Sequence, residues 1–205
     1  MMTSSVRKFA LTTHVTSSVG WLGAVAAFLA LALGGLTSHD ALTVRASHLA
    51  MEFVTWFVIV PLSVASLITG LVQSLGTAWG LFRHYWVVAK LGLTVVATVI
   101  LLVHTQPIGA VAQVALQGPL AAGDLRPLRM QLVADAVAAL FALLAATTLS
   151  VYKPWGMTAY GRRQVAAPTA VPISILWARP VLLAALGLLL LFVVWHLASG
   201  GMHGH

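Results

Sequence analysis

The segment HYWVVAKLGLTVVATVILLVHT, residues 84–105, decides the fold class because its length and apolarity match those of a membrane-spanning helix. A helix needs about 20 predominantly apolar residues to cross a hydrocarbon core of ~30 Å. Within the segment only Lys90 carries a fixed charge. A membrane β-strand would be short and would alternate apolar with polar residues, which this unbroken run does not do. We therefore predict an α-helix that spans a membrane.

Four other runs of the chain have the same character. We predict about five transmembrane helices in all, at residues 9–36, 42–75, 84–105, 128–152 and 178–199. Glycine- and proline-containing segments separate them, including Gly34-Gly35, Gly76 to Gly80, Pro107, Pro119 to Pro127 and Pro154 to Gly156. Residues 200–205 follow as a short tail of glycine, methionine and histidine. The predicted fold is an all-α integral membrane bundle that forms a single domain over residues 1–205.

The composition supports a protein that sits in lipid and excludes several functions. Hydrophobic residues make up 60% of the chain and charged residues 7%, whereas a soluble domain has about 25% charged residues. The net charge is +7, but the basic residues stand at the ends of apolar runs, so no nucleic-acid partner is expected. The chain has no cysteine, which excludes disulfides, iron–sulfur clusters and thiolate nucleophiles. Phosphate-loop and hydrolase motifs are also absent, which favours a protein that is not an enzyme.

Basic residues in short connections predict the orientation, because cytoplasmic loops carry an excess of Lys and Arg. One side of the predicted bundle carries Arg7, Lys8, Arg83, Lys153, Arg162, Arg163 and Arg179. The other side carries only Arg45, Arg126 and Arg129. We therefore expect the N-terminus inside and the C-terminus outside.

Ionisable side chains inside the spans are the candidate functional residues, because each costs roughly 2.5–3.5 kcal/mol near the membrane centre. In the predicted topology the outer half contains three histidines and two carboxylates: His48, His104, His196, Glu52 and Asp135. Histidines and carboxylates on facing helices commonly build metal sites in bundles. We therefore predict a His/carboxylate site that binds copper or haem b and serves metal handling or electron transfer.

Spacing adds a polar network to this site. His48 and Glu52 lie four residues apart and share a helix face, which Arg45 extends by one turn. Gln131 and Asp135 repeat that spacing. Lys90 and His104 fall within about 40° of each other around their helix, so both can face the bundle.

Two further groups are candidate ligands. His14 lies on the inner half of the first span and is a lesser candidate for a metal or haem ligand. The C-terminal tail offers the soft and borderline ligands Met202, His203 and His205, which would suit copper.

Two short motifs resemble the copper-resistance D type membrane domain. Residues 11–23, in which His14 is followed by Trp21 and glycines, are similar to its opening helix. Residues 85–94, which run on to His104, resemble a later helix. This resemblance implies copper handling that involves His14, although the chain is smaller and lacks the further spans of those proteins.

Residues 7–163 are also similar to a family of uncharacterised bacterial integral membrane proteins. The similarity includes the segments Tyr152 to Gly156 and Tyr160 to Arg163 near its end. It implies a multi-pass helical bundle in the bacterial cytoplasmic membrane.

Two other functions remain open. In the first, a proton-coupled transporter of a small solute uses Glu52 and Asp135, with Pro61 as a flexible point. In the second, the chain is an accessory subunit that binds a membrane partner or a second copy of itself through small-residue faces such as Gly20, Ala24 and Ala27.

Overall fold

The computed structural model describes residues 3–76, 80–117 and 126–166, and the regular structure in those ranges is helical. Four stretches are long and apolar enough to cross a membrane: α1 (Ser4–Thr37), the continuous stretch Ala41–Gly76, α4 (Tyr85–Gln117) and α5 (Arg126–Tyr152). This confirms the prediction of an all-α, multi-pass membrane protein. The fifth predicted span, 178–199, and the tail 200–205 lie outside the described residues.

The first 158 residues form one compact unit and the rest of the chain a second. In the second unit the structure describes α6 (Ala159–Ala166), a short polar helix in which Gln164 donates a hydrogen bond to the Tyr160 hydroxyl. The four long stretches belong to the first unit, which also contains the candidate site.

The second stretch is one continuous helix with a widened turn. It consists of α2 (Ala41–Val54), the π-helical turn η1 (Thr55–Ile59) and α3 (Val60–Gly76). Pro61 follows η1, and a proline ring clashes with the carbonyl four residues before it. A π turn relieves that clash and adds one residue without ending the helix. The predicted flexible point at Pro61 is therefore a local widening of a continuous helix.

Asp40 fixes the start of α2. Its carboxylate accepts hydrogen bonds from the backbone N–H and the hydroxyl of Thr43 and from the N–H of Leu42. These donors, the Thr43 hydroxyl first, lower the pKa of Asp40 below its ordinary value of 3.8. Asp40 stands three residues after Thr37, where α1 ends, so the chain reverses direction within a short connection before α2 begins at Ala41.

Helix α4 continues beyond the predicted end at residue 105. We expected Pro107 to interrupt it, but the helix runs through Pro107 to Gln117. Ile108, Val111 and Ala112 beyond the proline are all buried in the bundle. Their burial favours continued helix more strongly than the one missing backbone hydrogen bond opposes it.

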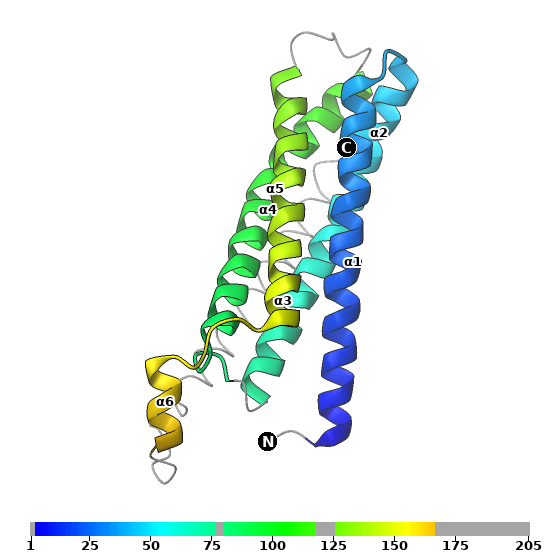
Figure 1. Ribbon diagram of the computed structural model, residues 1–205. Helices are drawn as coiled ribbons and strands as arrows, with labels where there is room; N and C mark the ends of the chain where they lie inside the picture. Colours follow the sequence, from blue (N-terminus) through cyan, green and yellow to red (C-terminus); the bar gives the residue numbers. More distant parts are fainter. Residues whose placement is uncertain (1–2, 77–79, 118–125, 167–205) are drawn as a thin grey trace. The chain divides into compact units, whose positions relative to one another are not determined.

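The four stretches form an antiparallel bundle (Figure 1). Helix α1 packs against α2, α3 and α5, and α4 packs against the same three, so α1 and α4 lie diagonally across the bundle. The core contains Trp21, Phe28, Met51, Ile59 and Leu132.

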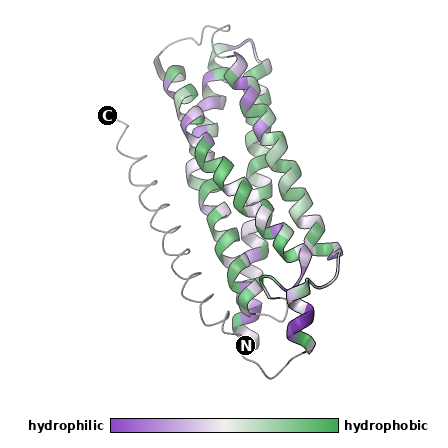
Figure 2. Ribbon diagram, turned by 90° about the vertical axis from the view of Figure 1, so that its left-hand side faces the viewer, coloured by the Kyte–Doolittle hydropathy of each residue, from purple (hydrophilic) through white to green (hydrophobic). Residues whose placement is uncertain are grey.

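The outward faces are apolar as well (Figure 2). Phe9, Phe57, Val103 and Phe141 are among the large side chains exposed there. A helix that is apolar on all sides is typical of a membrane span. The bundle therefore has a packed interior and an exterior suited to lipid.

Candidate functional site

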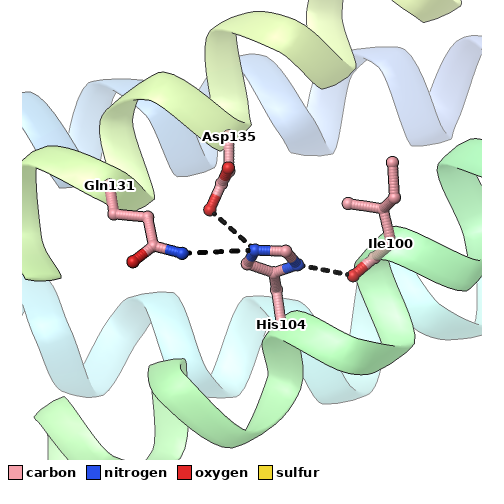
Figure 3. Close-up of polar contacts among 4 residues, drawn as sticks. All are labelled: Ile100, His104, Gln131 and Asp135. Carbon is pink, nitrogen blue, oxygen red and sulfur yellow. Dashed lines mark hydrogen bonds and ion pairs between the residues drawn. The ribbon is translucent and has the colours of Figure 1, made fainter.

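His104 of α4 and Asp135 of α5 meet across the interface between these helices. Nε2 of His104 lies 3.1 Å from Oδ2 of Asp135 and 3.5 Å from the amide nitrogen of Gln131 (Figure 3). The side chains of His104 and Asp135 are 24% and 34% exposed, so the pair is partly shielded. The structure thus brings together three residues that the sequence assigned to one polar site.

The contacts of His104 determine which protons the pair can hold. Nδ1 lies 2.8 Å from the carbonyl oxygen of Ile100, and a carbonyl only accepts, so Nδ1 carries a hydrogen. A hydrogen bond between Nε2 and Oδ2 needs one proton, either on Nε2 beside a carboxylate or on Oδ2 beside an unprotonated ring nitrogen. The pair has no net charge in either of these arrangements, which reduces its cost in a membrane.

A cavity of about 220 Å³ adjoins this pair. Trp21 and Phe28 of α1, Ile59 of η1, and residues of α4 and α5 line it, and its polar lining residues besides Trp21 are Thr55, His104 and Asp135. Thr55 donates its hydroxyl to the carbonyl of Met51, so that donor is already used. Oδ2 of Asp135 is shielded from solvent and, besides its ion pair with His104, has no hydrogen-bond partner among the described residues. A carboxylate oxygen has two lone pairs, so Asp135 can accept one further hydrogen bond beside an otherwise apolar wall.

His48 and Glu52 do not join this pair in a cluster of ligands. His48 is buried, and its Nδ1 donates to the carbonyl of Val44 at 2.7 Å. Its ring lies against Gly35 of α1, where a Cβ would stand 2.9 Å from Cε1. Glu52 lies against Gly109 of α4, and Arg45 is exposed.

Within the described ranges, no three His, Asp or Glu residues come close enough to hold a metal ion. His196 and the tail residues Met202, His203 and His205 lie outside those ranges. Copper and haem b binding therefore stay predictions.

A second polar cluster lies nearer the opposite end of the bundle. Nδ1 of His14 donates to the carbonyl of Ser66 and contacts the Thr69 hydroxyl, both at 3.1 Å. This leaves Nε2 as an acceptor, and Lys90 donates to it at 3.2 Å from the diagonally placed α4. Gly70 makes room for the ring, because a Cβ there would stand 3.1 Å from Cε1. Each ring nitrogen of His14 is satisfied.

One residue of interest was not identified from the sequence. Arg129, which we counted only as a topology signal, is just 7% exposed. It lies on the buried face of α5 with Leu132 and Ala136. Arg129 precedes these two apolar residues by three and seven positions, which places it on the same helix face. This spacing is a sequence signal that could have identified Arg129 as buried.

No family model, curated protein or solved structure matches the chain. Function can therefore be inferred only from the described residues, and the resemblance to the copper-resistance D type domain stays a prediction.

Proposed function

We propose that this membrane protein binds a small, largely apolar molecule in the cavity beside His104 and Asp135 and couples that binding to proton exchange at the pair. The observation that carries the proposal is the His104–Asp135 pair in the lining of the cavity of about 220 Å³, with the shielded Oδ2 of Asp135 3.1 Å from His104 and without a further hydrogen-bond partner. Asp135 retains the proton-exchanging role predicted for it in a proton-coupled transporter. His104 takes the role that was predicted for Glu52. We place the protein in a bacterial cytoplasmic membrane with the pair in its outer half.

The lining defines the chemistry of the ligand. Apolar side chains from α1, η1, α4 and α5 favour an apolar body through burial, at about 25 cal/mol per Å². The remaining acceptor position on Asp135 favours a hydroxyl or N–H group on that body, because a shielded carboxylate gains from a second hydrogen bond. A volume of about 220 Å³ is below the roughly 300–1,000 Å³ of pockets for drug-sized ligands. The ligand we propose is therefore small.

The proton link follows from the pair itself. A donor that approaches Oδ2 stabilises the carboxylate state of Asp135, since a carboxylic acid accepts more weakly. Ligand binding and the proton content of His104 and Asp135 are then linked, so each shifts the other. The π turn beside the cavity, which contributes Thr55 and Ile59, is a further feature often found at functional sites.

Two fluorinated probes of matched size test the proposal. We would titrate the full-length protein in detergent with 4-fluorophenol, which has a hydroxyl donor, and with 4-fluorotoluene, which has none, and follow ¹⁹F NMR signals between pH 5 and 8. We expect saturable binding of both probes, at least tenfold tighter for 4-fluorophenol, and an affinity for it that changes with pH.

Three variants give the controls. Asp135→Leu should remove the preference for 4-fluorophenol and its pH dependence, because the acceptor is lost. Ala139→Phe should abolish binding of both probes by filling the cavity. Any ¹⁹F signal change that remains in this variant then measures partition of the probe into micelles and can be subtracted. Val103→Ala, on the lipid-facing side beside His104, should change nothing. Equal signals in the wild type and Ala139→Phe would refute the cavity as a site, and a pH-independent affinity would refute the proton link.

A further inference from the structure

The first turn of α5 contains a buried cation with two unsatisfied nitrogens. Arg129 is only 7% exposed, and its Nε and Nη2 atoms are shielded from solvent and form no hydrogen bond within the part of the chain that the structure describes. Burying an unpaired charge is among the most costly arrangements in a protein. A natural chain retains such a group when a ligand completes it, so Arg129 points to a binding site.

The two free nitrogens define the shape of the missing ligand. Nε–H and one N–H of Nη2 lie along the same edge of the planar guanidinium and point in the same direction. This edge forms two parallel hydrogen bonds with the oxygens of a carboxylate or a phosphate. A single water or carbonyl oxygen would have to be shared between both donors, with bent hydrogen bonds, and would leave the charge uncompensated.

The charges nearby favour an anion. Arg126 and His48 lie close enough to Arg129 for electrostatic interaction, and the first turn of α5 contains no acidic residue. The dipole at the start of this helix also favours negative charge. No described carboxylate forms an ion pair with Arg129: Asp40 caps α2, Asp135 pairs with His104, and Glu52 lies against Gly109.

From these observations we propose that Arg129, with Arg126 and the first turn of α5, forms a binding site for a phosphate or carboxylate oxyanion at this end of the bundle. Arg129 takes the anion with two hydrogen bonds, and Arg126 adds charge. The anion is either the headgroup of an anionic lipid or a small soluble oxyanion, and the chemistry of recognition is the same for both. The site does not depend on the function proposed for the cavity.

Thermal unfolding of the delipidated full-length protein in an uncharged detergent tests the site, with helicity followed by circular dichroism. One arm adds inorganic phosphate against sodium chloride of equal ionic strength. The other adds phosphatidylglycerol against phosphatidylcholine. A phosphate-specific rise in the midpoint identifies a soluble oxyanion, and a rise with phosphatidylglycerol alone identifies a lipid headgroup. No rise in either arm would overturn the proposal.

Substitutions then assign the effect to Arg129. Arg129→Gln should weaken binding at least tenfold. Arg129→Lys, which keeps the charge and loses the paired donors, should also lose most of it. Arg7→Gln, the matched control at an exposed arginine of α1 outside the site, should retain the binding, and Arg126→Gln should weaken it less than Arg129→Gln because Arg126 is exposed.

The unfolding midpoint without ligand separates this role from a structural one. Arg129→Gln should unfold at the wild-type temperature or above it, since the substitution removes an unpaired buried charge. A folded Arg129→Gln variant that keeps the full ligand-induced rise in the unfolding midpoint would overturn the proposal. A variant that unfolds below the wild-type temperature without ligand, and at the wild-type temperature with ligand, would also overturn it, because it would still bind the ligand.

Discussion

The two polar clusters on α4 use similar residues in opposite ways. At His14 both ring nitrogens have partners, and the ring links three helices through Ser66, Thr69 and Lys90. At His104 the ring contacts Asp135, whose shielded oxygen has no second hydrogen-bond partner, and an apolar cavity lies beside the pair. The first cluster is satisfied by residues of the bundle, whereas the second has room for a ligand, which is the basis of the proposed function. A histidine inside a membrane bundle therefore indicates a binding site only when a neighbouring group retains hydrogen-bonding capacity.

The largest expected effect is that of His14→Ala. This change removes the contacts to α3 and leaves Lys90 without its acceptor, so we expect a loss of about 2–3 kcal/mol in the free energy of unfolding. His104→Ala should cost less than about 1 kcal/mol, because its cluster adds little to helix packing. Reversible unfolding in mixed micelles, followed by circular dichroism, measures both. Equal losses would remove the distinction between the clusters.

A smaller effect is expected for Gly70→Ala. The new Cβ would stand 3.1 Å from Cε1 of His14, and the ring cannot move aside because both of its nitrogens are held. We expect a loss of about 1 kcal/mol. Gly92→Ala is the matched control, since a Cβ there meets nothing within 4 Å. That variant should gain up to about 0.5 kcal/mol from reduced chain entropy, and a loss there as large as at Gly70 would show that the His14 contact is not the cause.

Asp135→Asn should change stability still less, by about 0.5 kcal/mol or below. Asparagine keeps an oxygen that accepts a hydrogen bond but has no proton to exchange. The variant should therefore keep some preference for 4-fluorophenol and lose its pH dependence, in contrast to Asp135→Leu, which loses both. ¹⁹F NMR titrations at pH 5 and pH 8 make the comparison. A pH dependence that survives in Asp135→Asn would assign the proton to another group.

The smallest effect on stability is expected for Asp40→Asn, and it appears only at low pH. Its pKa is lowered by hydrogen bonds from Thr43 and Leu42, so its contribution to stability is present above pH 3.8 and is lost as the pH falls through the lower, folded-state pKa. Asp40→Asn keeps a good helix cap. The unfolding midpoint of Asp40→Asn should equal that of the wild type at pH 6. Below pH 3.8 the midpoint of the wild type should fall further as Asp40 becomes protonated, and that of Asp40→Asn should lack this part of the decrease. The same decrease in both proteins would assign it elsewhere.

Sequence reasoning predicted the helices well because apolar length is a local property. The spans expected at 9–36, 42–75 and 128–152 correspond to helices at Ser4–Thr37, Ala41–Gly76 and Arg126–Tyr152. The end of α4 was placed too early, because residues beyond Pro107 remain helical through burial against other helices. That burial is a tertiary effect, which no local signal reveals.

The candidate site was predictable only in part. Spacing placed Gln131 and Asp135 on one face and allowed His104 to point inward, and these three residues do meet. Spacing also grouped His48 with Glu52, but which neighbours they face depends on helix order and rotation. A close approach at Gly35 determines the surroundings of His48, and nothing in the local pattern shows which helix makes that approach.

The π turn at Thr55–Ile59 sets the angular phase between the two halves of one long helix. On one side of it His48 faces Gly35 near the end of α1, and on the other side Ser66 faces His14 near the beginning of α1. Each residue of an α-helix turns the chain by about 100°, so removal of the extra residue would rotate one of these faces away from α1 by that angle. A deletion of a single residue here would therefore uncouple the two docking faces without changing any side chain in either, whereas a deletion in a surface loop would leave both in place.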